Sequence, residues 1–192
     1  MKMDYNISFN CFHGTIKHFS DEIIKSRKFT IKKRNDHWLG SGVYFFINDK
    51  SKAEWWAKET RKLAKRNIGT SKSPVDTTRK ILYLEANLNN RDLLDLDTED
   101  GQRKFSEFNS HLERHNFKFI RSTDDSATEH QARCEILDLL VEVESYKACS
   151  YTFESDRDEL YKGTKKYGIL NKGKQLSVYD QTIIDFDTLK VL

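Results

Sequence analysis

Short segments with the pattern of β-strands recur along the chain, and helical segments separate them at irregular intervals. Residues 7–13 alternate apolar and polar side chains with period two, and Val43–Ile47 and 81–86 also have the apolar character of strands. Further strands are predicted at 147–153 and 174–179. Because strands and helices are mixed without a regular strand–helix–strand alternation, the pattern favours an α+β fold over a doubly wound parallel sheet.

Three helices are expected between the strands. The first should span residues 16–25. Ser51 and Glu54 have the spacing of a capping box, in which each side chain bonds the backbone N–H of the other residue. A second helix should therefore begin there and end near residue 67. The same spacing recurs at the start of a third helix, expected over 127–142.

The 192 residues are enough for one compact domain with a buried core, and no linker divides residues 1–192. With 33% charged and 37% hydrophobic residues but one proline, the chain is polar without being a low-complexity sequence. No apolar run reaches the roughly 18 residues that a membrane-spanning helix needs, and the N-terminus lacks the features of a signal peptide. We therefore expect a single cytoplasmic domain without membrane association.

The net charge of +3 hides an uneven distribution. Residues 1–83 carry 18 basic and 8 acidic side chains, a net of +10, whereas residues 84–159 carry 9 and 19, a net of −10. On the second helix, basic residues recur three or four positions apart and predict a basic stripe of Lys58, Arg61, Lys62 and Lys65. Such a surface could neutralise nucleic-acid phosphates, or stay solvated against the acidic half.

The three cysteines, Cys11, Cys134 and Cys149, are far apart in the sequence and form no CxxC pair. No histidine stands near them at ligand spacing, so the pattern predicts neither a disulfide framework nor a zinc site. We expect the three thiols to be buried as small apolar side chains, and we predict no metal centre.

Two glycine-flanked motifs are the clearest chemical features of the chain. In FHGT, residues 12–15, a histidine ends a strand and a glycine follows it, so a ligand can approach the backbone closely. In WLGSGVYFF, residues 38–46, two glycines precede a tyrosine at the start of a strand. The ring of this tyrosine could stack on a flat ligand, and the backbone amide and carbonyl beside His13 could pair with a planar carboxamide.

In this order, the two motifs resemble those of the ADP-ribosyltransferases of the diphtheria-toxin-like clade, whose signature is a His–Tyr–Glu triad on three strands. The segments AEWWA, residues 53–57, and KGKQLSVYDQTII, residues 172–184, also resemble the bacterial members. The resemblance extends over most of the chain. It implies split antiparallel β-sheets around an NAD cleft, with flanking helices, in a single domain.

The resemblance also implies roles for individual residues. His13 would hydrogen-bond a ribose hydroxyl of NAD, Gly14 would pair through its backbone with the nicotinamide amide, and Tyr44 would stack on the nicotinamide ring. Thr15 and Gly42, which neighbour these residues in the motifs, belong to the same implied NAD site. The reaction of the family uses NAD as a co-substrate and needs no metal.

The third triad position falls on Gln175, where the family has glutamate. A carboxylate there would hydrogen-bond the ribose 2′-OH and stabilise the positive charge that develops as the nicotinamide bond breaks, whereas glutamine keeps only the hydrogen bond. Removing one such preorganised group typically lowers a rate by about 10² to 10³. Glu85, Glu129 or Glu154 could supply the charge from elsewhere in the fold.

The resemblance implies a mono-ADP-ribosyltransferase that passes ADP-ribose from NAD to a macromolecule. The basic stripe slightly favours nucleic acid, RNA or DNA, over protein as the acceptor. By analogy with bacterial members, the protein is expected to be an intracellular toxin or phage-defence effector, with a neutralising antitoxin protein as its partner.

Three alternatives stay open. Gln175 is compatible with a catalytically inactive module that binds NAD or ADP-ribose, and with an NAD glycohydrolase that passes ADP-ribose to water. The third alternative is an RNA 2′-phosphotransferase on a related fold. Tyr44 argues against it, because the resemblance gives that ring its role in stacking on nicotinamide.

Overall fold

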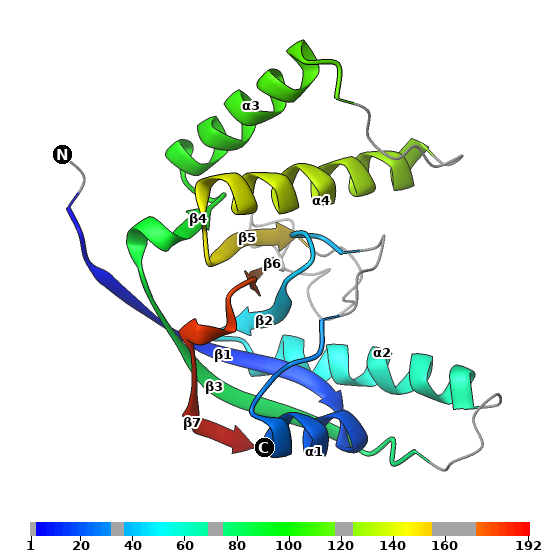
Figure 1. Cartoon of the computed structure of the whole chain (residues 1–192). Helices are drawn as coiled ribbons and strands as arrows, with labels where there is room; N and C mark the ends of the chain where they lie inside the picture. Colours follow the sequence, from blue (N-terminus) through cyan, green and yellow to red (C-terminus); the bar gives the residue numbers. More distant parts are fainter. Residues whose placement is uncertain (1–2, 32–36, 69–74, 118–124, 155–171) are drawn as a thin grey trace, which may run out of the picture.

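The computed structural model of the chain describes residues 3–31, 37–68, 75–117, 125–154 and 172–192. It confirms the α+β class, since a seven-stranded mixed sheet packs against helices (Figure 1).

The seven strands are hydrogen-bonded in the order β4-β5-β6-β2-β1-β3-β7. Only β4 and β5 run parallel, and every other pair of neighbours is antiparallel. The bounds of the strands are β1 Asn6–Ile16, β2 Val43–Ile47, β3 Arg79–Asn89, β4 Leu93–Asp95, β5 Ala148–Glu154, β6 Lys172–Val178 and β7 Ile184–Val191.

The described helices are α1 Lys17–Ser26, α2 Lys50–Ile68, α3 Glu99–Arg114 and α4 Asp125–Glu144, with single turns η1 Asn90–Asp92 and η3 Gln181–Ile183. Helix α2 packs on β1 and β3, and α3 lies beside α4 (Figure 1). Side chains of α4 pack on the β4–β5–β6 part of the sheet.

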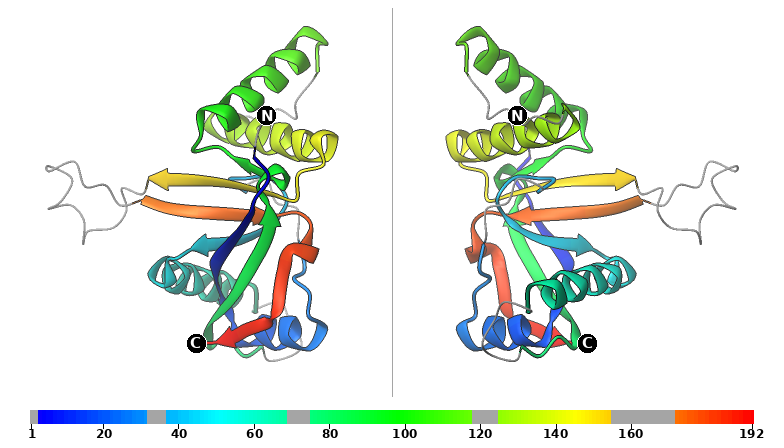
Figure 2. Two further views of the ribbon diagram at one scale, coloured as in Figure 1. Left: turned by 90° about the vertical axis from the view of Figure 1, so that its left-hand side faces the viewer. Right: turned by 90° about the vertical axis from the view of Figure 1, so that its right-hand side faces the viewer.

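The sheet is almost divided between β1 and β2. All 11 residues of β1 pair with β3, but β1 pairs with β2 only at Cys11, opposite Ile47, and at Phe12, opposite Phe46. Beyond Phe12 the two strands diverge, and the β1–β3–β7 half turns away from the β5–β6–β2 half (Figure 2). We call this opening the split; it is bordered by residues 13–16 of β1 and by residues 43–45 of β2.

Two apolar clusters pack on the two faces of the sheet, and the larger one joins its halves. The larger cluster lies on the face of the sheet that carries Cys11, Phe45 and Leu176, and it joins strands of both halves with Ile23 of α1 and with Phe29. The smaller cluster lies on the opposite face, beneath α3 and α4; it contains Leu39, Leu94, Leu137, Leu140, Cys149 and the rings of Tyr44, Tyr151 and Tyr179. The split therefore opens between two packed cores.

The strand predictions at Val43–Ile47, 7–13, 81–86, 147–153 and 174–179 are confirmed, although β1 and β3 are several residues longer than expected. The long β1–β3 pairing explains the difference, because the ladder stabilises polar strand ends that show no apolar pattern.

The helix over 16–25 is confirmed as α1, and α2 and α4 also match the predictions in extent. The capping box at Ser51, however, is wrong. Helix α2 begins at Lys50, and the carboxylate of Asp49 accepts the Lys52 N–H at 2.9 Å. At the start of α4, the side chain of Ser126 lies outside what the structure describes, so the second capping box stays a prediction.

Helix α3 and strands β4 and β7 were not predicted. Gly101 lies in the first turn of α3, where an added Cβ would lie 2.0 Å from the Asp95 carbonyl oxygen, so glycine permits close packing. The Thr98 hydroxyl accepts the Gly101 N–H at 3.1 Å and caps the helix.

The three cysteines are buried free thiols, as expected, and burial raises the pKa of Cys11 to about 12. None of the helices in the described part of the chain is long and apolar enough to cross a membrane.

Gly14 should be essential to the docking of α2 on β1. A Cβ at Gly14 would lie 1.9 Å from the Ala53 carbonyl oxygen, so we expect Gly14→Ala to lower the free energy of unfolding by about 1–3 kcal/mol, the usual effect of overpacking. Urea denaturation would measure it. Gly173→Ala is the matched control, because its Cβ would meet the Lys52 side chain at an ordinary 3.6 Å. Equal stability of the two variants would contradict this account.

Candidate active site

The split leaves the backbone of Gly14, a buried residue, without a pairing partner on β2. The Asn48 N–H donates to the Asn10 carbonyl oxygen at 2.9 Å, so the β1 residues that bond toward β2 are the even-numbered ones. Along an antiparallel strand, the backbone groups of successive residues point alternately to one neighbouring strand and to the other. Phe12 is the last residue of β1 that pairs with β2. The N–H and C=O of Gly14, two residues further along, therefore point toward the β2 side, into the split. A planar amide could pair with these two groups as an added strand would.

His13 bridges the split. Its Nδ1 lies 2.9 Å from the Tyr44 carbonyl oxygen. A carbonyl only accepts, so Nδ1 carries the proton and the neutral ring offers Nε2 as an acceptor. Burial lowers the pKa of His13, against the smaller opposing effect of the bond to Tyr44, and so favours the neutral ring. The rings of Phe29 and Phe45 pack against the imidazole, with centroids 5.2 and 5.7 Å away.

Tyr44 is fixed at both ends. Its hydroxyl accepts the Leu39 N–H at 2.6 Å and donates to the Gly40 carbonyl oxygen at 2.7 Å, while its own carbonyl accepts from His13. Burial raises the pKa of the phenol, so Tyr44 stays un-ionised. The His37 ring lies 5.3 Å from the Tyr44 ring, centroid to centroid. This tyrosine is thus a rigid wall of the site.

The glycines of the 38–46 motif serve the packing of the loop before β2. Gly40 has a φ of +71°, and a Cβ there would lie 2.0 Å from the Tyr179 hydroxyl oxygen. Gly42 sits against β6, where a Cβ would lie 2.3 Å from Ser177 Oγ. The structure therefore gives Gly42, a predicted NAD-binding residue, contacts with the protein itself.

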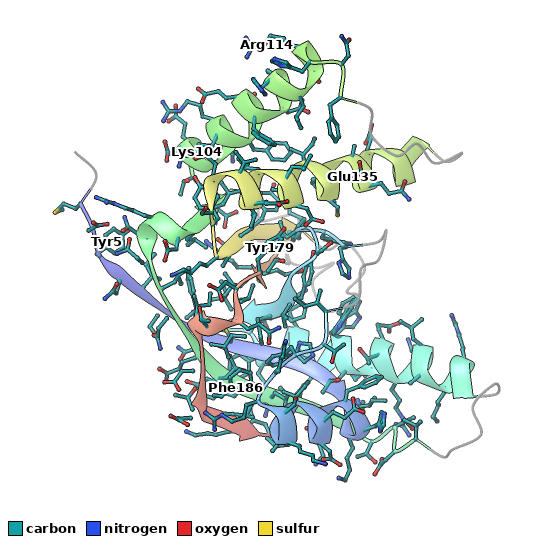
Figure 3. The ribbon with its side chains drawn as sticks, viewed as in Figure 1. Tyr5, Lys104, Arg114, Glu135, Tyr179 and Phe186 are labelled. Carbon is teal, nitrogen blue, oxygen red and sulfur yellow. The ribbon has the colours of Figure 1, made fainter. Side chains whose placement is uncertain are left out.

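Asp138 of α4 locks the same loop. Its two carboxylate oxygens accept the N–H and the hydroxyl of Ser41, each at 2.6 Å. Tyr179, labelled beneath α4 in Figure 3, donates its hydroxyl to the Leu39 carbonyl oxygen at 2.8 Å. Sequence reasoning missed both residues, because nothing local links positions 138 and 179 to the glycine motif.

Gln175 lies on β6 directly between Phe46 of β2 and Tyr151 of β5. Alternation puts it on the same face as Tyr44, one strand away. His13 has the opposite alternation, and its ring packs on Phe29 and Phe45 of the larger cluster, while its Nδ1 bonds the Tyr44 carbonyl oxygen. The three predicted triad residues thus come from three neighbouring strands, with Tyr44 and Gln175 on one face of the sheet and His13 on the other. Thr15, also on β1, is buried at 3% exposure.

Of the carboxylates proposed to assist Gln175, Glu85 and Glu154 do not lie beside it. Glu85 lies on β3, opposite Asn10, and Glu129 lies on α4. Glu154 ends β5 and, by alternation, lies on the face opposite to Gln175.

A cluster of charges does lie next to Gln175 in sequence, but on that opposite face. Lys174 Nζ lies 3.1 Å from an Asp95 carboxylate oxygen and 3.0 Å from Asp97. The hydroxyls of Ser150 and Thr152 donate to these two aspartates at 2.9 and 2.7 Å. This network ties β4, β5 and β6 together where the third motif strand begins.

The predicted basic stripe on α2 is divided by burial. Lys58, Lys62 and Lys65 are exposed, and Lys62 pairs with Glu59 at 2.6 Å. Arg61 is half-buried, and its Nε is enclosed without a hydrogen bond among the described residues.

An aromatic pair lies on the same helix. Trp55 and Trp56 are 44% and 39% exposed, with ring centroids 5.8 Å apart. Exposed rings beside exposed lysines can bind the bases and phosphates of a single strand.

Comparison with known proteins adds little. No model of a protein family matches the chain. An uncharacterized protein of Methanocaldococcus jannaschii is 30% identical over 66 residues, which are 33% of this chain and 31% of that protein. The chain thus matches about a third of that relative's length. Nor does the described part of the chain contain a cluster of three metal-ligating side chains. Function must be argued from the site.

The Lys174 cluster should make stability depend on pH. Burial alone would raise the pKa of Asp97, but the bonds from Thr152 and Lys174 outweigh it and hold that pKa below its usual value. The carboxylate therefore stabilises the fold above about pH 4, and the effect is lost as the pH falls through the folded pKa. We expect Asp97→Asn to reduce the free energy of unfolding at pH 7 and the gap from wild type to close toward pH 3.

Urea denaturation across this pH range measures the gap. Asp187→Asn is the control, because its exposed pair with Arg27 contributes little at any pH. A gap that stays constant with pH would contradict the assignment.

Proposed function

We propose that the protein is an NAD-dependent mono-ADP-ribosyltransferase with split β-sheets of the diphtheria-toxin-like type. The observation that carries the proposal is the split between β1 and β2, with the Gly14 backbone turned into it and the His13–Tyr44 hydrogen bond across it. These are the residues for which the sequence resemblance implies contact with NAD.

In this proposal the protein binds the nicotinamide end of NAD in the split. The N–H and C=O of Gly14 pair with the carboxamide, as in one further step of a β-ladder. His13 accepts a hydrogen bond from a ribose hydroxyl at Nε2, because its Nδ1 proton is engaged with the Tyr44 carbonyl. The fixed Tyr44 ring limits how the nicotinamide can tilt, which orients the reacting bond.

The reaction replaces one bond at the ribose C1′ by another. The bond from C1′ to the nicotinamide nitrogen breaks, its electron pair leaves with nicotinamide, and C1′ becomes oxocarbenium-like. A nucleophilic oxygen or nitrogen of the acceptor then bonds to C1′ and gives up its proton. Gln175 can hold the ribose 2′-OH but adds no negative charge, so electrostatic stabilisation at this position is weak.

Nucleic acid is the acceptor that we favour. Exposed Trp55 and Trp56 offer stacking faces, and Lys58, Lys62 and Lys65 follow on the same helix. This combination suits a single strand, whose bases stack on rings while its phosphates meet lysines. By analogy, the biological role is that of an intracellular toxin or phage-defence effector neutralised by an antitoxin protein.

A second candidate rests on Gln175. Because Glu85 and Glu154 do not lie beside it, a protein that binds NAD or ADP-ribose without transferring it is the second candidate. Transfer to water, as in an NAD glycohydrolase, uses the same site and differs only in the acceptor.

Nicotinamide release from NAD by the purified protein, with and without added RNA or DNA, tests the proposal. We expect release with acceptor present, and a fall of about 100-fold or more in His13→Ala, which loses both a ribose contact and the bridge across the split. His18→Ala, on exposed α1, is the matched control and should keep the wild-type rate. NAD binding without release under any condition would establish the binding module instead.

Gln175→Glu restores the charge that the family has. If the site catalyses transfer, we expect the rate of nicotinamide release to rise by about 10²-fold, since the new carboxylate stabilises the developing cation. The control is Ser51→Glu, which adds a carboxylate at an exposed position and should not change the rate of nicotinamide release. An unchanged or lower rate in Gln175→Glu, with NAD binding intact, would argue against an oxocarbenium-like step at this position.

A further inference from the structure

A cavity of about 380 Å³ lies between β5 and the two helices α3 and α4. Tyr151 and Phe153 of β5 form one wall, Phe105 and Gln102 of α3 form the other, and Arg133 of α4 lies at its edge. Neither the proposed NAD contacts nor the basic stripe uses these residues.

Three aromatic rings, those of Phe105, Tyr151 and Phe153, line the cavity together with Leu39 and Leu96. The Tyr151 and Phe153 rings meet edge to face with centroids 4.8 Å apart, and Trp38 meets Phe153 in the same way at 4.6 Å. Trp38 is 40% exposed, so this row of rings continues from the cavity to the surface. Such a lining favours a flat, uncharged ring over an aliphatic chain.

The polar groups suit the edge of such a ring. Gln102 donates one amide hydrogen to the Leu96 carbonyl oxygen at 3.0 Å, which fixes its orientation and leaves its side-chain oxygen as an acceptor. The Arg133 Nε donates to the Trp38 carbonyl oxygen at 3.2 Å, so the guanidinium is held at the cavity edge. Nucleobases are read by this combination of stacking and amide or guanidinium hydrogen bonds.

The cavity is connected to the basic helix α2. Phe153 pairs across the sheet with Gly173 of β6, and the Lys52 side chain passes over this glycine, 3.6 Å from where a Cβ would stand. Lys52 belongs to the first turn of α2, ahead of the exposed tryptophans and lysines. The path from α2 to the cavity also passes the proposed active site, because Tyr151 is the strand neighbour of Gln175.

We propose that this cavity binds one unpaired base of a single-stranded nucleic-acid acceptor, while Lys52 and the lysines of α2 hold the neighbouring phosphates. A base is uncharged, so the acidic surface of α3 and α4 does not repel it, whereas a phosphate chain would avoid those helices. The inference rests on the proposed function, since it names how the acceptor is recognised beside Gln175.

The test measures two affinities of the full chain: for fluorescein-labelled oligouridylate and oligoadenylate, and for NAD. Phe153→Leu removes a ring but keeps apolar volume, and we expect it to weaken oligonucleotide binding by about ten-fold while NAD binding stays at the wild-type level. Phe153→Tyr keeps the ring and should keep the affinity. Phe117→Leu, the same change at an exposed phenylalanine beyond α3, is the control.

A second variant tests the other wall. Phe105→Leu on α3 should have the same effect, so the proposal is decided even if one of the two variants fails to fold. Lys52→Gln should weaken binding and make it depend less steeply on salt, by about one unit of slope.

Three results would overturn the inference. They are oligonucleotide binding unchanged in the ring variants, a loss of NAD binding in place of oligonucleotide binding, and no oligonucleotide binding by the wild type. The last would leave the proposed transferase intact if nicotinamide is still released, because a protein acceptor would then take the place of nucleic acid. Absence of nicotinamide release together with oligonucleotide binding would overturn the transferase and leave the base site standing.

Discussion

The hydrogen bond from His13 to the Tyr44 carbonyl is the interaction on which the candidate site depends. Without it, the split between β1 and β2 would be an unsatisfied gap in a sheet, with backbone groups on both edges lacking a ladder partner. The imidazole closes one side of that gap and leaves the Gly14 backbone on the other side for a ligand. The same bond fixes the tautomer, so one contact both holds the fold and sets the chemistry of the ring.

The glycines Gly14 and Gly40 near the split are needed for the packing of the protein as well as belonging to the motifs of the candidate site. Gly14 is needed for α2 to approach β1, and the first turn of the same helix brings the Lys52 side chain next to Gly173 of β6. Gly40, in turn, lets Tyr179 reach the loop before β2. A glycine motif that predicts room for a ligand can therefore also mark a place where two segments of the same chain pack closely.

The sequence made the α+β class and the confirmed strands predictable, because Val43–Ile47 and the neighbouring apolar runs are strands by local pattern alone. It could not show that Asp138 binds Ser41, since 97 residues separate them, nor that Lys174 meets Asp95 and Asp97. Helix α3 was not predicted, although Thr98, whose hydroxyl accepts the Gly101 N–H, is a residue type that favours the start of a helix. Local pattern predicts elements, and contacts between distant elements decide the site.

Charge is arranged around Gln175 so that the missing carboxylate is not replaced by its neighbours. The nearest acidic residues in the strand network, Asp95 and Asp97, face the other side of the sheet and are already paired with Lys174. Rotating one of them toward Gln175 would break that pairing and the hydroxyl bonds of β5. The transferase that we propose would therefore rely on orienting its two substrates rather than on charge, and the proposed base site beside Tyr151 would orient the acceptor.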